Sequence, residues 1–115
     1  MAYTEVARLA DVPVGSAVKV EVGGEPVAVV RLADDVVRAV HNVCSHQQYD
    51  LAPEGIVAGN DIECALHGSM FNLDTGEPDA LPAVKPIPVY ACRIDGDSVL
   101  VDLDQQLNDA PVPRH

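Results

Sequence analysis

Two short stretches of this sequence each place a cysteine and a histidine close together, and they restrict the possible folds more than any other feature. The first holds Cys44 and His46 in a C-x-H pattern, and the second holds Cys64 and His67 in a C-x-x-H pattern. In both, an apolar alternating segment ends just before the cysteine. Thiolates and imidazoles are the ligands that zinc and iron prefer, so two facing loops of this kind would form a four-ligand metal site.

The remainder of the chain predicts short β-strands. Valine alternates with polar residues, and turn sequences such as GGE, ADD, Gly-Asn and DGD separate the apolar segments. No segment has helical periodicity over a long window, although residues 9–13 could hold one turn. We therefore expect an all-β domain, a sandwich or a small barrel. The segments expected to form strands are 17–22, 26–33, 36–43, 56–59, 61–65, 69–73, 85–94 and 98–103.

Length and charge limit the classes of function. The chain has 115 residues, enough for one domain, which we place at residues 1–103. The polar, proline-rich residues 104–115 are expected to form a frayed tail. A net charge of −11 argues against nucleic acid and against anionic membrane surfaces. With no long apolar run, no secretory pattern at the N-terminus and an odd number of cysteines, a reducing cytoplasm is expected.

The four paired residues leave two kinds of metal centre open. Two cysteines and two histidines could hold a structural zinc ion. They could also hold a [2Fe–2S] cluster with thiolates on one iron and imidazoles on the other. Zinc modules usually group like ligands, whereas here each loop supplies one cysteine and one histidine. The mixed arrangement favours a binuclear centre, because each loop can then reach both metal ions.

The sequence resembles the Rieske family. The signature is carried by NVCSH and by GIVAGNDIECALHGSMFNLDTGEPDALPA, and the likeness continues through VYACRIDGDSVLVDL, so that it covers roughly residues 18–103. The resemblance implies stacked antiparallel sheets with one [2Fe–2S] cluster per chain, held at a tip by two loops within about 41–84. It also implies the cluster ligands: Cys44 and Cys64 on the inner iron, and His46 and His67 on the outer iron.

Departures from the family pattern indicate which branch the chain resembles. Respiratory Rieske proteins carry a disulfide between the two loops, but here those positions are Tyr49 and Leu66. They also have a tyrosine near the cluster where this chain has Phe71. Both differences favour the soluble ferredoxins of ring-hydroxylating and related non-haem iron oxygenases. Ser69 could donate to a cluster sulfide, as in the high-potential type, or bond the local backbone. Cys92 is expected to be a small buried hydrophobe on a strand.

The resemblance implies a one-electron carrier that passes electrons from a flavoprotein reductase to a non-haem iron oxygenase. No nucleophile–base pair is visible, so the chain is not expected to be an enzyme by itself. His41 and His115 lie outside the motif and receive no ligand role. Residues 80–83, with Pro82, correspond to a proline loop that covers the cluster. Three alternatives stay open: the small subunit of assimilatory nitrite reductase, a Rieske protein associated with iron–sulfur assembly, and a structural zinc-binding module.

The charge of the cluster-binding segment predicts how a partner approaches. Residues 41–84 contain no lysine or arginine, so we expect docking on a basic patch of the redox partner. The segment carries seven carboxylates: Asp50, Glu54, Asp61, Glu63, Asp74, Glu77 and Asp79.

Overall fold

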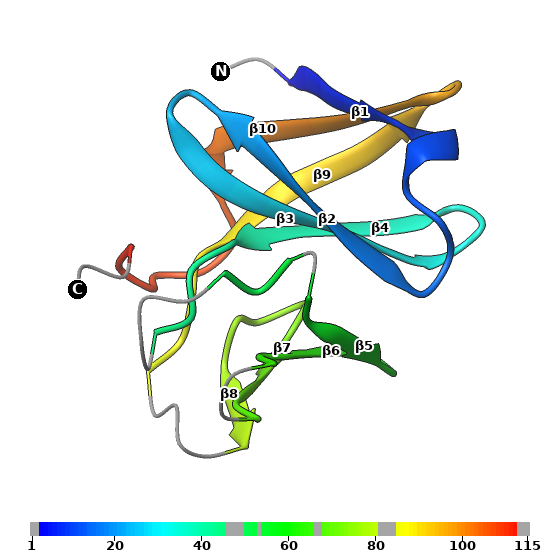
Figure 1. Ribbon diagram of the computed structural model, residues 1–115. Coiled ribbons are helices and arrows are strands. Elements are labelled where there is room, and N and C mark those ends of the chain that lie inside the picture. Colours follow the sequence, from blue (N-terminus) through cyan, green and yellow to red (C-terminus); the bar gives the residue numbers. More distant parts are fainter. Residues whose placement is uncertain (1–2, 46–49, 53, 66–67, 81–84, 113–115) are drawn as a thin grey trace.

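The computed structural model describes residues 3–45, 50–52, 54–65, 68–80 and 85–112, which form two antiparallel sheets (Figure 1). A six-stranded sheet has the order β1-β10-β9-β4-β3-β2, and a four-stranded sheet has the order β5-β6-β7-β8. A single 3-10 turn, η1, covers Leu9–Asp11. The strands are β1 (Thr4–Arg8), β2 (Ser16–Val22), β3 (Glu25–Ala33), β4 (Val36–His41), β5 (Ile56–Ala58), β6 (Asp61–Glu63), β7 (Met70–Asn72), β8 (Pro78–Ala80), β9 (Val89–Asp95) and β10 (Ser98–Gln106). The all-β prediction is confirmed.

The large sheet is built from hairpins whose turns are specified by glycine. β2 and β3 pair without a break from Ser16–Arg31 to Val22–Glu25. Gly23 and Gly24 connect them with φ angles of 55° and 83°, as a two-residue hairpin turn requires. The edge strands β1 and β2 also contact each other, so the sheet curls toward a barrel (Figure 1).

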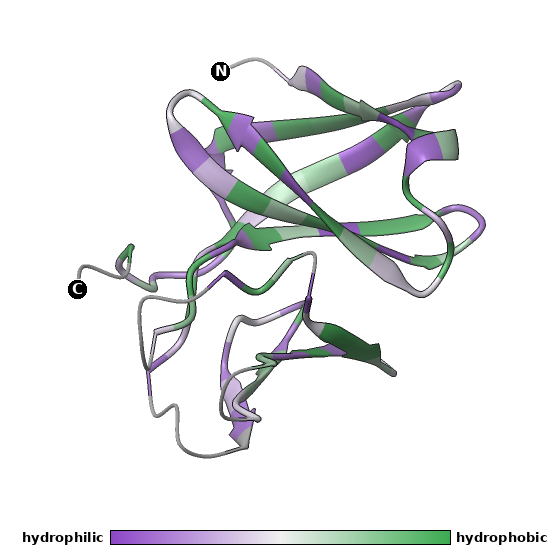
Figure 2. Ribbon diagram, viewed as in Figure 1, coloured by the Kyte–Doolittle hydropathy of each residue, from purple (hydrophilic) through white to green (hydrophobic). Residues whose placement is uncertain are grey.

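Strand β3 is buried on both faces, and this explains its continuous apolar sequence. Val27 and Val29 belong to the core inside the curled large sheet. Ala28 and Val30, which point the other way, belong to a second core. Figure 2 shows the hydrophobic residues recurring along this strand and its neighbours.

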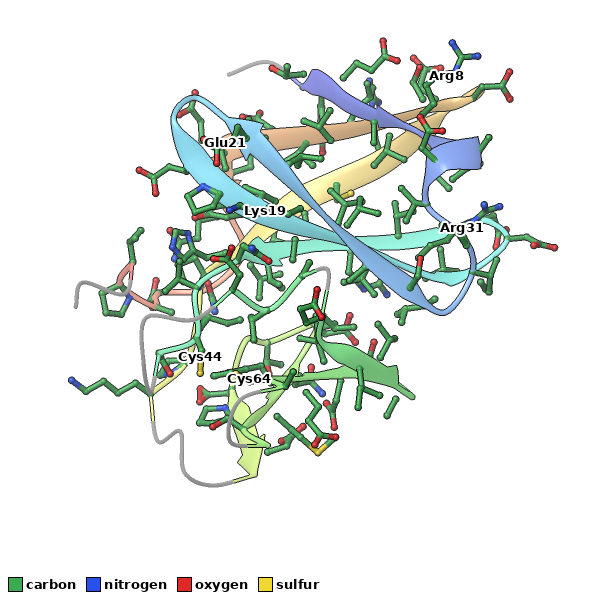
Figure 3. All side chains as sticks on the ribbon, viewed as in Figure 1. Arg8, Lys19, Glu21, Arg31, Cys44 and Cys64 are labelled. Atoms are coloured by element: carbon green, nitrogen blue, oxygen red, sulfur yellow. The ribbon has the colours of Figure 1, made fainter. Side chains whose placement is uncertain are left out.

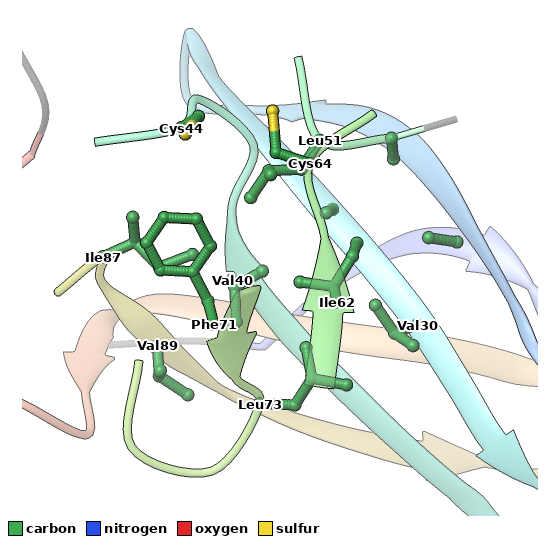
Figure 4. Close-up of a cluster of buried hydrophobic side chains, with 13 residues drawn as sticks. Val30, Val40, Cys44, Leu51, Ile62, Cys64, Phe71, Leu73, Ile87 and Val89 are labelled. Atoms are coloured by element: carbon green, nitrogen blue, oxygen red, sulfur yellow. The ribbon is translucent and has the colours of Figure 1, made fainter. Parts of the chain in front are cut away.

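The second core joins the small sheet to the large one. Chain order inserts the small sheet between β4 and β9. Ile62, Phe71 and Leu73 from the small sheet are fully buried in one cluster with Val30 and other side chains of the large sheet (Figure 4). The small sheet is therefore packed against the large sheet through a shared apolar core.

Polar side-chain contacts reinforce this attachment. Arg38 Nε of β4 lies 2.6 Å from Asp74 Oδ1 in the turn after β7, and Lys19 Nζ of β2 lies 2.9 Å from Asp50 Oδ2 in the segment that leads to β5. Asn108 Nδ2 donates to the backbone oxygens of Thr75 and Ile87, both at 2.8 Å.

The structure differs from the sequence-based prediction at two short strands. β1 was not expected because TEVAR is largely polar, and it forms because it pairs with β10 at the edge of the sheet. β8 was not expected because it begins with Pro78, and proline is tolerated only at such edges. In the segment 85–94 the strand begins only at Val89, after Pro86 and Pro88.

The predicted frayed tail is wrong for residues 104–110. β10 continues to Gln106, and Leu107 N donates to Val89 O at 2.7 Å. Gln106 Nε2 donates to the backbone oxygen of Ala110, which is buried. Polar side chains thus hold this segment by bonding the backbone, which composition alone does not reveal. Residues 113–115, with His115, lie outside the described residues, and the domain range 1–103 stays a prediction.

No helix in the described part of the chain has the length and apolar character needed to cross a membrane.

Candidate metal centre

The two cysteines of the paired motifs meet in the interior. Cys44 follows β4 and Cys64 directly follows β6, and they are 1% and 2% exposed. Both belong to the buried cluster between the sheets. In Figures 3 and 4 the two thiol side chains lie next to each other. The expectation that the two loops bring these thiols together is therefore met.

Apolar side chains surround the thiols and exclude water. Leu51, Phe71 and Ile87 are all 0% exposed and share the cluster with both cysteines (Figure 4). Phe71 offers no hydroxyl to this site. A charged or redox-active group held here would sit partly in a medium of low dielectric constant, where nearby dipoles act strongly.

The first loop is closed at its base by backbone and side-chain bonds. Val43 and Asp50 form an isolated antiparallel bridge, and Leu51 N donates to Asn42 O at 2.7 Å. The buried side chain of Asn42 accepts a hydrogen bond from Ala52 N at 2.7 Å and donates one to Ala52 O at 3.2 Å. Sequence reasoning missed Asn42. An asparagine at the end of a buried strand is the available signal, because a buried amide must find partners.

The second loop is equally tight. Cys64 N donates to Ser69 O at 2.7 Å, and Gly68 N donates to Cys64 O at 3.0 Å. Gly68 has a φ of 79°, which explains the glycine that follows the C-x-x-H motif. Ser69 is completely buried, so its hydroxyl lies inside the protein rather than in solvent.

One side-chain bond joins the first loop to the segment that precedes β9. Ser45, the residue directly after Cys44, donates from its Oγ to Lys85 O at 2.6 Å. Residues 81–84, including Pro82, lie outside the described residues, so the covering role predicted for them stays a prediction.

The predicted histidine ligands are not tested by the structure. His46 and His67 lie outside the residues that it describes. Among the remaining residues, no three His, Cys, Asp or Glu side chains gather in a way that could hold a metal ion. The four-ligand assignment therefore stays a prediction, supported by the position of its two cysteines.

The other histidine and cysteine with described positions lie elsewhere. His41 stands opposite Val27, whose side chain faces the core of the large sheet. Its Nδ1 is 3.9 Å from Glu25 Oε1. Cys92 packs against the same core, and burial raises the pKa of its thiol to about 12. Cys92 is thus an inert strand residue, as expected.

The acidic residues of segment 41–84 fall into different electrostatic states. A hydrogen bond from Arg38 is the main reason that the pKa of Asp74 is lowered, and a hydrogen bond from Asn60 lowers it further. Burial of the Asp61 carboxyl raises its pKa to about 6, and a hydrogen bond with Asp79 and the negative charge of Asp79 add to this shift. Glu54 is exposed. Asp50 and Asp74 are also paired with basic side chains, Asp50 with Lys19 and Asp74 with Arg38.

Comparisons with known proteins give consistent matches over most of the chain. The family model described as Rieske [2Fe-2S] domain matches residues 2–91. The ferredoxin component of biphenyl 2,3-dioxygenase from Rhodococcus jostii (strain RHA1) is 35% identical over 104 residues, covering 90% of this chain and 95% of that protein.

Solved structures give the same result. The ferredoxin of carbazole 1,9a-dioxygenase from Nocardioides aromaticivorans IC177 superposes with a TM-score of 0.82 at 37% identity, covering 88% of this chain and 97% of that one. A complex of reduced oxygenase and oxidised ferredoxin in carbazole 1,9a-dioxygenase matches with a TM-score of 0.77 at 33% identity, covering 86% of this chain and 91% of that one.

Proposed function

The chain belongs to the Rieske [2Fe–2S] domain family, and on this basis we propose that it carries single electrons from a flavoprotein reductase to a non-haem iron oxygenase. It is an electron-transfer component that holds one [2Fe–2S] cluster and is not itself the catalytic subunit. The observation that carries the proposal is the pair of buried thiols, Cys44 and Cys64, at the ends of two closed loops.

The proposed ligands are Cys44 and Cys64 for one iron and His46 and His67 for the other. The residues present fit this group, because two buried thiols meet in an apolar interior and soft sulfur donors suit an iron–sulfur cluster. Such a cluster accepts and returns one electron, and its neutral imidazole ligands raise its potential above that of four-cysteine clusters.

The protein residues around the thiols limit water and fix the loops. Leu51, Phe71 and Ile87 fill the space beside the thiols, and the bonds at the two loop bases keep the cysteines in place. Solvent exposure and hydrogen bonds to sulfur are the main means by which a protein sets the potential of such a cluster. Phe71 cannot donate a hydrogen bond from its side chain, which favours a potential in the lower part of the range.

The partner is proposed to dock through a basic patch at the acidic end that carries the loops. Because Lys19 and Arg38 already pair with Asp50 and Asp74, the attraction should depend more on the exposed Glu54 and Asp79. A negative patch of this kind raises the rate of encounter with a positive partner. We place this exchange in the cytoplasm.

The ferredoxin assignment is favoured over the alternatives. The family match and the ferredoxin relatives support an iron–sulfur carrier rather than a structural zinc module. The same relatives are components of dioxygenase systems, which favours an oxygenase partner over a nitrite reductase or an assembly role.

The direct test of function is electron delivery in a reconstituted system. The cluster-loaded protein is mixed with a flavoprotein reductase and a ring-hydroxylating oxygenase, with NADH as the electron source. We expect reduction of the oxygenase to require this protein and to stop when Cys64→Ser replaces it. Full reduction of the oxygenase without the protein, or none with it, would contradict the proposal.

The docking proposal is tested by the dependence of the second-order rate constant on salt. Screening lengths fall from about 10 Å at 0.1 M to about 3 Å at 1 M ionic strength, so the wild-type rate should drop as salt rises. Replacing Glu54 and Asp79 with their amides should flatten this dependence.

A matched control separates local docking from total charge. Asp34 and Asp35 are also exposed and lie in the turn at the start of β4. The six residues of β4 put about 20 Å of strand between them and the loop that carries Cys44. Replacing both with asparagine changes the net charge equally but should leave the salt dependence near that of the wild type. Equal flattening by both double variants would refute docking at the cluster end.

A further inference from the structure

We propose that Asn42 is a positioning residue that fixes both ends of the first cluster loop and thereby controls how firmly the cluster is held. The inference rests on the proposed ligand role of Cys44, two residues further along the chain. Asn42 is completely buried, although its side chain is a polar amide, and we assign it no ligand role.

All the hydrogen-bonding groups of Asn42 have partners within the protein. Its backbone N donates to Pro26 O at 3.0 Å, and its backbone O accepts from Leu51 N at 2.7 Å. Its side chain accepts from Ala52 N at 2.7 Å and donates to Ala52 O at 3.2 Å. One residue thus links the beginning of β3, the entry of the loop and its exit.

These bonds restrict the loop at the positions that matter for Cys44. The base of the loop is the bond between Leu51 N and Asn42 O. The next residues into the loop, Val43 and Asp50, are paired by an isolated bridge. Leu51 then packs with both thiols in the buried cluster. Holding the exit of the loop therefore also holds an apolar wall beside the cysteines.

Only an amide satisfies this position. The bond pair to Ala52 needs one donor and one acceptor on the same planar group, which asparagine provides. Leucine has similar size but no polar atoms, so it would leave both backbone groups of Ala52 buried without the bonds they now make. The loop would then open more often, and water would reach the cysteines.

A loosened loop has measurable consequences for the cluster. Residues that orient ligands without touching the metal typically contribute 10- to 100-fold to metal affinity. We expect Asn42→Leu to release its cluster to a chelator about 10 to 100 times faster than wild type. We also expect faster hydrogen exchange in peptides that span residues 43–52, and altered line shapes in the EPR spectrum of the reduced protein.

Asn108→Leu is the matched control. Asn108 is also an asparagine with several bonds to the backbone, donating to Thr75 O and Ile87 O and accepting from Val89 N at 3.1 Å. It anchors the C-terminal segment rather than the first cluster loop. Its loss should lower the thermal midpoint while leaving the exchange of residues 43–52 unchanged, because its bonds reach the turn after β7 and the approach to β9 rather than the first cluster loop.

The comparison is decided with cluster-loaded proteins. If Asn42→Leu assembles no cluster, Asn42→Ser, which keeps a small polar group, is measured in its place. Cluster release no faster than in wild type, with an unaltered EPR spectrum and exchange of residues 43–52 no faster than in Asn108→Leu, would overturn the proposal. A wild-type protein without a Rieske EPR signal would instead refute the proposed function, so the two failures are distinguishable.

Discussion

Gly76 is the position where a single added carbon should disturb the joint between the two sheets most. It lies in the turn between β7 and β8 with a φ of 75°, and it is buried. A Cβ atom there would meet the backbone oxygen of Ile87 and lie 2.5 Å from Asn108 Nδ2. Ile87 N also donates to Gly76 O at 2.9 Å, so the turn and the approach to β9 are directly bonded.

The cost of Gly76→Ala follows from these contacts. A left-handed conformation costs a residue with a side chain about 1–2 kcal/mol. The clash with Ile87 O involves backbone, so it cannot be relieved by rotating a side chain. Moving the strand away would weaken the Ile87–Gly76 bond and the Asn108–Ile87 bond, each with a net contribution of about 0.5–1.5 kcal/mol. We therefore expect a loss of about 2–5 kcal/mol in the free energy of unfolding.

Gly59→Ala is the matched control, because Gly59 has a φ of 60° but no atom within 4 Å of the added carbon. It should lose only the conformational term, about 1–2 kcal/mol. The difference of about 1–3 kcal/mol corresponds to thermal midpoints about 4–12 °C apart, measured by circular dichroism of the cluster-loaded proteins. Equal midpoints for the two variants would refute the assignment of Gly76 as a close-contact position.

Three other predictions concern the cluster and the acidic face. Cys44→Ser and Cys64→Ser should each lose the visible absorption of the cluster, whereas Cys92→Ala should keep it; bleaching by Cys92→Ala would show that the ligands are misassigned. The reduction potential should fall in the lower half of the range of about −150 to +300 mV, and Phe71→Tyr should raise it. A wild-type potential near the top of this range, measured by voltammetry, would refute the role given to Phe71. Because the pKa of Asp61 is raised to about 6 in the folded protein, stability should fall as pH rises from about 4 to about 6. Asp61→Asn should remove that part of the pH dependence, and thermal midpoints that run parallel to the wild type across this interval would contradict it.

The sequence predicts the strands of the large sheet other than β1, and the meeting of the two cysteines, because both leave local signals. Valine alternation with glycine turns determines the β2–β3 hairpin, and the spacing of Cys44 and Cys64 indicates loops at strand ends. The double burial of β3 agrees with its continuous apolar residues 27–30, once a second sheet is known to pack on it.

The missed features depend on contacts between distant residues. Asn108 and Asn42 are polar residues at the ends of strands, and their position in the sequence does not show which distant backbone groups their amides bond. The pairing of Lys19 with Asp50 joins β2 of the large sheet to the segment between β4 and β5, so a uniformly negative segment in the sequence is partly neutralised in space. The order of residues 104–110 was missed for the same reason, because Leu107 and Asn108 bond residues far away in the sequence.

EPR spectroscopy of the protein reduced with dithionite decides whether the chain holds a [2Fe–2S] cluster with histidine ligands. We expect a red-brown protein whose reduced form has a rhombic signal from one unpaired electron, with hyperfine coupling to histidine nitrogen. Labelling histidine with ¹⁵N should change that coupling, and His46→Ala or His67→Ala should abolish the signal. A colourless protein that contains zinc and gives no EPR signal after reduction would refute the [2Fe–2S] assignment.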